Sequence, residues 1–268
     1  MIELFDGDRK EDDRRSSKGN QLKWKKGKIW YKADYLGYEG LSEFLCAKML
    51  AHSNLDAAEF VSYDTEEISY KKSVMRGCSS RDFLKEGEQL VTLERLFSAR
   101  YGRSLGAAVY GIPAIEDRVR FLAETVSQMT GIPDFGVYLN KILTIDALFL
   151  NEDRHTHNIA VIRKEDDSFR LCPVFDHGAS LLSDTTLDYP LGEDTYSLID
   201  SVKAKTVCDS FAVALEASEK LYGGNLRFSF DRHDIRAALE DDTVYPAEFK
   251  ARAEKVLLEQ RRRYSYLF

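Results

Sequence analysis

A polar loop and the hairpin after it constrain the fold more than any other part of the chain. Residues 135–150 are mostly apolar and are expected to form a helix, and the polar segment NEDRHTHN follows at residues 151–158. Two apolar segments come next, Ile159–Ile162 and Phe169–Val174. The charged tip between them predicts a β-hairpin with its turn near Glu165–Ser168. Because a hairpin brings its exit close to its entrance, the residues after the second strand are expected near the polar segment.

Side chains that suit phosphoryl transfer lie at the open end of this hairpin. Asp153, His155 and Asn158 precede it, and Asp176 and Gly178 follow it. Phosphoryl transfer needs a carboxylate that orients the attacking hydroxyl and oxygen ligands that hold Mg²⁺ on the nucleotide phosphates. Asp153 fits the first role, whereas Asn158 and Asp176 fit the second. His155, like Asp153, is a candidate catalytic residue. Its side chain is expected to pack inward and to hydrogen-bond to the backbone. Gly178 is expected to let the chain turn past the metal.

Two other interpretations of these residues remain open. A polar loop can carry Asp and Asn simply to cap turns. In addition, His155-x-His157 has a spacing suited to metal ligation on a strand, and His177 lies nearby, as in a transition-metal hydrolase. However, no remote histidine with a carboxylate partner completes such a set, and Asn158 is a poor zinc ligand. His177 is instead expected to flank Asp176.

The N-terminal part of the chain is expected to form a sheet and one helix. The expected strands are 21–24, 28–33, 58–63 and 68–75, with turns at Lys25–Gly27 and Asp64–Glu67. Residues 41–50 carry apolar side chains at helical spacing. Lys32 lies near the end of a strand, where its ammonium could reach nucleotide phosphates. Glu43 on the following helix is its expected partner, with Glu39 as the alternative.

Nearly all of the chain after residue 78 is expected to be helical. The expected helices are 89–100, 115–130, 135–150, 206–222, 232–240 and 246–263, the last opened by Pro246. Residues 180–200 are expected to form a polar loop. The sequence therefore predicts an α+β fold with the two-lobed outline of a protein kinase. The small β-rich N-lobe would span residues 1–78, and the larger helical C-lobe, with the loop and the metal-binding hairpin, residues 79–268.

Composition limits the partners and the compartment. The net charge is −7, so no global basic field exists to hold nucleic acid, and the basic run Lys23–Lys28 is interpreted as a solvated hairpin tip. The four cysteines lie far apart without a C-x-x-C pair, which fits reduced thiols in the cytoplasm. The sequence shows no signal peptide and no apolar run of about 18 residues, so no membrane association is expected. An effector secreted without a cleaved signal would have the same features.

At these residues the sequence resembles the HipA-like serine/threonine kinases and, more distantly, the phosphoinositide kinases. The specific motif is D-R-H-x-x-N, followed after a short hairpin by D-x-G. The segment SSKGNQLK, which starts at Ser16, is similar to the HipA phosphate loop, roughly S-x-x-G-x-Q-x-K. That loop lies close to the start of the chain. The sequence therefore looks like the compact, CtkA-like short forms of the family, or like toxins whose N-terminal subdomain is a separate chain.

The resemblance implies a role for each matching position. Ser16 would be an autophosphorylation site that inactivates the enzyme when modified. The remaining implied roles are Gly19, Gln21 and Lys23 in the phosphate loop, Lys32 as the ATP lysine, Glu43 as its ion-pair partner, Asp153 as the catalytic aspartate, Asn158 and Asp176 as Mg²⁺ ligands, and an adenine-binding hinge after Met75.

We therefore expect an ATP- and Mg²⁺-dependent serine/threonine protein kinase that autophosphorylates on Ser16 or Ser17. A phosphoinositide or small-molecule kinase would share the loop motif, but residues 180–200 are acidic where a lipid kinase should be basic. A catalytically silent nucleotide-binding module that docks a partner is the alternative from another class. The expected partners are a protein substrate and, for a short form, an antitoxin or a separate N-terminal subdomain, without direct contact to nucleic acid or membrane.

Overall fold

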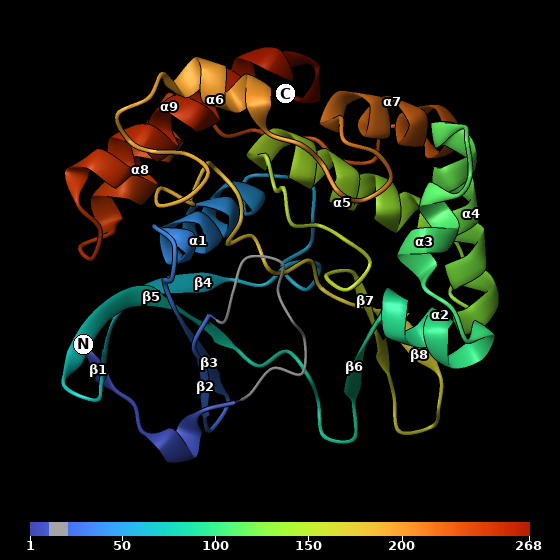
Figure 1. Cartoon of the computed structure of the whole chain (residues 1–268), viewed down its shortest axis with the longest axis horizontal. Coiled ribbons are helices and arrows are strands. Elements are labelled where there is room, and N and C mark those ends of the chain that lie inside the picture. The colour runs from blue at the N-terminus through green and yellow to red at the C-terminus, as the bar shows by residue number, and fades with distance from the viewer. Residues whose placement is uncertain (11–20) are drawn as a thin grey trace.

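The computed structural model describes residues 1–10 and 21–268, and these form a mixed α+β fold (Figure 1). The strands of the N-terminal sheet are β1 (Ile2–Glu3), β2 (Lys23–Lys26), β3 (Ile29–Ala33), β4 (Tyr63–Tyr70) and β5 (Ser73–Arg81), in the order β1-β4-β5-β3-β2. Only the β1–β4 pair among them is parallel within the described residues. Figure 1 shows this sheet on one side of the molecule and most of the helices on the other. The expected α+β class is confirmed.

The hairpin of β2 and β3 places its two faces in different surroundings. Lys23 pairs with Lys32, and Trp24 pairs with Tyr31. Successive side chains on a strand point to opposite faces. Trp24 and Tyr31 are therefore buried in a small cluster on one face of the sheet, whereas the two lysines lie on the other. The turn follows Lys26 and includes Gly27 at φ 61°, which is slightly later than expected.

The hairpin of β4 and β5 corrects one expectation. The acidic segment Asp64–Glu67, expected as the turn, lies inside β4, where Glu66 accepts a 2.9 Å hydrogen bond from the Ser79 hydroxyl. The chain turns instead at Lys71 and Lys72, both with positive φ (48° and 66°). Two such residues match a type I′ turn, which usually carries Asn or Gly. A lysine pair gives no such signal.

Helix α1 (Glu39–Leu50) is buried on nearly all sides. It packs against β4 and β5 on one side and α8 on another, and Leu41 and Leu45 belong to the main hydrophobic core. The helix fits so closely because Gly40 lacks a side chain: a Cβ atom there would lie 2.5 Å from the Gly77 carbonyl carbon and from the Tyr245 hydroxyl. The expected helix is present and begins two residues earlier.

The helices after the N-terminal sheet form the larger part of the molecule (Figure 1). They are α2 (Leu93–Tyr101), α3 (Leu105–Tyr110), α4 (Ile115–Thr130), α5 (Phe135–Phe149), α6 (Thr195–Ser201), α7 (Phe211–Tyr222), α8 (Arg232–Asp241) and α9 (Ala247–Arg263). Among the described residues, no helix is long and apolar enough to cross a membrane. The expected two-lobed, kinase-like outline is present, and the boundary at residue 78 stays a prediction that falls inside β5.

Two expected helices begin too early, and one loop contains a helix. Residues 89–92 form strand β6 (Gln89–Thr92), and α2 starts only after Thr92, whose side chain accepts from Arg95 N. Residues 206–210 are not helical, because Ser210 is the N-cap of α7. Helix α6 occupies the end of the expected polar loop at 180–200.

The central hairpin is present as β7 (Ala160–Arg163) and β8 (Phe169–Leu171). Strand β6 adds to its other side and makes a three-stranded sheet in the order β6-β7-β8. Helix α5 leads into the polar loop and ends at Leu150, which has a left-handed φ of 56°. This hairpin and helix together position the loop at 151–158.

Candidate active site

Lys32 links three elements that are distant in sequence. Its Nζ atom lies 2.6 Å from Glu43 Oε1 on α1 and 2.8 Å from Asp176 Oδ1 after β8. Lys32 also lies over the ring of Tyr63 at 5.5 Å, and Tyr63 Oη accepts from the backbone N–H of Asp176 at 3.3 Å. Of the two glutamates considered as partners of Lys32, Glu43 is thus the one in contact. Glu39 instead accepts from the backbone N–H groups of residues 35–37.

The opposite charges in this network stabilise one another. Burial alone would lower the pKa of Lys32, but the Asp176 and Glu43 carboxylates outweigh it and raise that pKa. Burial would raise the pKa of Asp176, but Lys32 and then Lys23 outweigh it and hold that pKa far below its usual range. Burial raises the pKa of Glu43, and the Lys32 ammonium limits the rise. Asp176 therefore stays ionised at neutral pH.

Asp153 sits in the loop between α5 and β7, and the described groups around its carboxylate include Asn158, His155 and Lys205. Asn158 Nδ2 donates to Asp153 Oδ2 at 3.3 Å and to the Asp153 carbonyl at 2.8 Å. On the other side, His155 Nε2 lies 3.6 Å and Lys205 Nζ 3.7 Å from Asp153 Oδ1. His155 also accepts from the backbone N–H of His157 through Nδ1. It is half-buried and bonds to the backbone, as the sequence suggested.

Arg154 joins the two ends of the hairpin. Its Nη1 atom donates to the carbonyl oxygens of Asn158 at 3.0 Å and Phe175 at 2.7 Å. Its Nε atom lies 3.1 Å from the buried carboxylate of Asp146 on α5. Asn151 Nδ2 adds a 3.1 Å bond to the Asp176 carbonyl. The Arg154 guanidinium therefore holds the backbone of Asn158 close to the backbone just before Asp176, as expected for a hairpin that returns to its start.

The donor set fits a hard divalent cation such as Mg²⁺. Because Asn158 Nδ2 donates to Asp153, its Oδ1 is the atom that remains to ligate, and Oδ1 accepts no hydrogen bond from the described residues. Asp176 uses Oδ1 for Lys32, while its Oδ2 accepts none from the same residues. One neutral and one ionised oxygen thus remain available, which suits Mg²⁺ better than zinc.

Two residues do not have the expected positions. Met75 was expected at the adenine-binding hinge, but it lies in the middle of β5, opposite Ile68, and packs against the Trp24 cluster on the face away from Lys32. Strand β5 continues to Arg81, so the residues directly after Met75 are strand and not a hinge. Gly178 has no positive φ; the left-handed residue is Asp176, at φ 65°. The sharp turn therefore occurs at the aspartate itself.

The expected phosphate loop is described only in part. Ser16, Ser17 and Gly19 lie outside the described residues. Gln21 is half-buried ahead of β2, and Lys23 opens that strand directly opposite Lys32. Lys23 is close enough for its charge to lower the pKa of Asp176.

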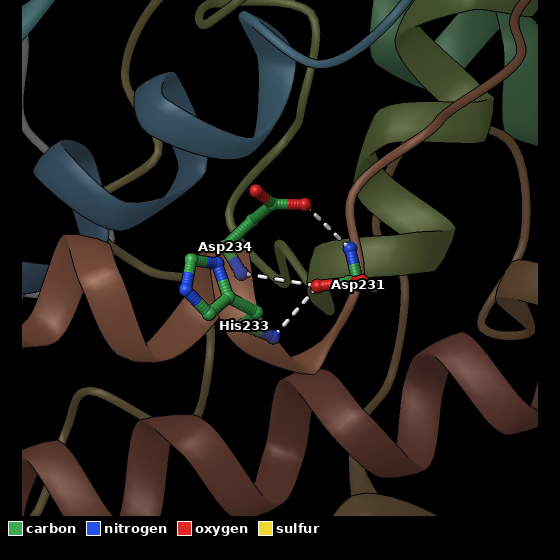
Figure 2. A group of neighbouring side chains, drawn as sticks. All are labelled: Asp231, His233 and Asp234. Atoms are coloured by element: carbon green, nitrogen blue, oxygen red, sulfur yellow. Dashed lines mark hydrogen bonds between the residues drawn. The ribbon is translucent and has the colours of Figure 1, made fainter.

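The histidines of the loop do not assemble a metal centre. His155 and His157 stack edge to face at 5.4 Å, and His177 is fully buried. Across the described residues, one group of three possible ligands lies close enough for a metal: Asp231, His233 and Asp234 (Figure 2). Its hydrogen bonds are those of a capping box at the start of α8, with Asp231 accepting from the other two backbone N–H groups. A capped helix explains this group.

Sequence reasoning missed several residues that support the loop. Glu94 on α2 accepts a 2.7 Å bond from Thr156 and two bonds from the backbone of α3. Asp146 and Arg154 form a buried ion pair that also supports the loop. The signal for Asp146 was present, since a carboxylate in the apolar run of α5 needs a charged partner. Tyr63 and Lys205 carried no such signal.

A β-sheet whose lysine pairs with a helix glutamate, next to a helical part that carries an aspartate loop and a short hairpin, is typical of a kinase fold. The chain is similar to the crystal structure of the Helicobacter pylori proinflammatory kinase CtkA, with a TM-score of 0.52 and 15% identity over 91% of this chain and 88% of that one. This likeness confirms the expected kinase fold. No protein-family model matches the chain, and no curated protein matches it either.

Proposed function

We propose that this protein is an ATP- and Mg²⁺-dependent kinase that phosphorylates serine or threonine in proteins. The network of Lys32, Glu43 and Asp176 beside the loop of Asp153 and Asn158 carries the proposal. In a kinase fold, this network lies where the nucleotide phosphates bind. The kinase likeness and the D-R-H-x-x-N motif support the same reaction.

Each residue has a distinct task in the proposed reaction. Asp153 accepts a hydrogen bond from the acceptor hydroxyl, whose oxygen lone pair forms the new bond to the γ-phosphorus. The bond from the γ-phosphorus to its bridging oxygen breaks, and its electron pair leaves on ADP. The hydroxyl proton passes to Asp153. Lys32 holds the α- and β-phosphates. Asn158 and Asp176 would hold Mg²⁺, which would supply positive charge that neutralises the phosphates.

The adenine ring is proposed to bind next to the segment that follows Arg81. Phe83 in that segment packs against the small apolar cluster that contains Val61 and Cys78, and its ring centroid lies 5.8 Å from that of Phe175. Cys78 lies directly opposite Lys32 in the sheet, on the same face. An apolar wall next to the phosphate lysine suits a nucleotide base.

Ser16 is proposed as the regulatory site. A phosphate there would add about −1.5 to −2 charges to the segment that precedes Lys23 in the sequence. This charge would compete with ATP for Lys23 and Lys32 and so weaken nucleotide binding.

Transfer from γ-labelled ATP with Mg²⁺ tests the proposal directly. We would compare the wild type, Asp153→Ala and Ser16→Ala/Ser17→Ala, and map the label by mass spectrometry. Label on Ser16 or Ser17 in the wild type, absent from Asp153→Ala, is expected. Mg-ATP binding without transfer to itself, to casein or to phosphoinositide vesicles would indicate a silent nucleotide-binding module. Transfer to the vesicles alone would indicate a lipid kinase.

A further inference from the structure

Lys205 is a cation at the active site that comes from outside the loop and hairpin motifs. It follows α6, and its Nζ atom lies 3.7 Å from Asp153 Oδ1. Its side chain is 41% exposed, and its ammonium faces the carboxylate. An ammonium at this position lies close to any group that hydrogen-bonds to Asp153.

The backbone around Lys205 is fixed to the catalytic loop. Thr206 is buried, and its hydroxyl donates a 2.6 Å hydrogen bond to the Arg154 carbonyl, one residue after Asp153. The Ala204 N–H donates to the Asp209 carbonyl, and the Val207 carbonyl accepts from Arg118 Nη1 at 2.9 Å. Lys205 thus extends from an anchored segment toward the site, which limits the entropy lost when its ammonium binds a ligand.

The contact itself shows that the ammonium can take another partner. At 3.7 Å, Lys205 and Asp153 are farther apart than in a charge-assisted hydrogen bond, which is about 2.7–2.9 Å long. Lys32, by contrast, lies at such distances from both Glu43 and Asp176. Lys205 is therefore held less closely by its carboxylate than Lys32 is, and its ammonium can move toward an incoming anion.

We propose that Lys205 is a further catalytic residue, whose ammonium binds the γ-phosphoryl oxygens during transfer. This inference rests on the proposed kinase function. The acceptor hydroxyl bonded to Asp153 attacks the γ-phosphorus, so a cation within 4 Å of that carboxylate reaches the phosphoryl oxygens. In a loose transition state, negative charge is spread over those oxygens, and a positioned cation there lowers the barrier.

The test uses Lys205→Met, with Lys205→Arg to restore the charge and Lys203→Met as the matched control. Lys203 lies on the same segment, is 73% exposed and faces Asp209 instead. We expect Lys205→Met to lower kcat about 100-fold with little change in the KM for ATP. Lys205→Arg should recover part of this loss, and Lys203→Met should match the wild type.

Binding of a transition-state mimic separates direct contact from an indirect effect through Asp153. ADP, Mg²⁺ and aluminium fluoride together imitate the transferring phosphoryl group. Lys205→Met should weaken binding of this mixture at least about tenfold, while binding of Mg-ADP alone stays unchanged. Equal binding of the mixture by wild type and Lys205→Met would overturn the inference, as would unchanged kcat. A wild type that transfers no phosphate would instead count against the proposed function.

Discussion

The Tyr245 hydroxyl donates a 2.7 Å hydrogen bond to the Asp34 carboxylate across 211 residues of sequence. The other Asp34 oxygen accepts from the Gly40 N–H at 2.7 Å, and Tyr245 Oη also lies 3.3 Å from the Gly77 carbonyl. This partly buried group of hydrogen bonds thereby joins the end of β3, the start of α1, strand β5 and the segment before α9. Because α1 carries Glu43, this contact helps to fix the glutamate relative to Lys32.

The charge state of Asp34 should make stability depend on pH. Burial, and then the nearby Glu39 carboxylate, raise the pKa of Asp34 to about 8, compared with about 3.9 in an unfolded chain. Between these values the folded protein holds a proton that the unfolded chain lacks, so the contribution of Asp34 to stability falls as pH rises from about 4 to 8. Asp34→Asn should flatten the pH dependence of the thermal unfolding midpoint between pH 5 and pH 8. The exposed Asp56→Asn is the control, and a curve for Asp34→Asn parallel to that of the wild type would contradict this assignment.

Lys32 and Glu43 should depend on each other energetically. Lys32→Met leaves a buried carboxylate without its ammonium, so it should destabilise the protein more in the wild type than in a Glu43→Gln background. We expect a coupling of roughly 0.5–3 kcal/mol from urea unfolding of the four proteins in the cycle. Additive changes in the free energy of unfolding would argue against a direct ion pair.

Arg154→Met should be among the most damaging substitutions near the site. It leaves Asp146 buried without its partner and frees two backbone carbonyls, at a cost of roughly 3–5 kcal/mol at neutral pH. Burial raises the pKa of Asp146 to about 6 even with Arg154 beside it. Protonation near pH 5 should therefore relieve part of the loss, as should Asp146→Asn in the same chain. A loss of stability that is the same at pH 5 and pH 8 would be inconsistent with an unpaired aspartate as its cause.

Substitution by alanine should lower the stability of the protein much more at Gly77 than at Gly178. A Cβ atom at Gly77 would lie 2.0 Å from the Lys32 carbonyl oxygen, whereas the nearest atom to one at Gly178 is Glu39 Cβ at 3.5 Å. Gly77→Ala must push β3 away from β5 and should lower the thermal unfolding midpoint strongly. Gly178→Ala should cost little stability. Similar midpoints for the two variants would show that β3 and β5 can separate without loss.

The sequence correctly predicted those elements for which the hydrophobic periodicity and the residues at the ends indicate the same bounds. The helix at 115–130 has one apolar face and a glycine after it, and α4 has these bounds, with Gly131 at φ 70°. The helix at 135–150 and the central hairpin were found in the same way. The loop residues Asp153 and Asn158 could be placed together with Asp176 because a hairpin fixes that neighbourhood by geometry alone.

Other features depend on contacts that the local sequence does not encode. Lys71 and Lys72 adopt left-handed conformations that lysine rarely signals, so the β4–β5 turn was misplaced and Met75 with it. Strand β6 has four residues and gains its pairing from β7, far along the chain. The approach of Lys205 to Asp153 depends on the Thr206 hydrogen bond to Arg154, which no spacing in the sequence suggests.

Side chains along β2 point alternately to the two faces of the sheet. A single inserted residue would therefore disturb the site and the core at once. Lys23 faces the site and Trp24 faces the core, so a shift of one position in the β2–β3 register would exchange them. The indole would then point toward the candidate site and the ammonium into the Leu4 and Tyr70 cluster. Insertions of two residues preserve the alternation, whereas insertions of one do not. Deep mutational scanning of this hairpin should therefore show an even–odd rule for tolerated insertion lengths, with folding and catalysis lost together.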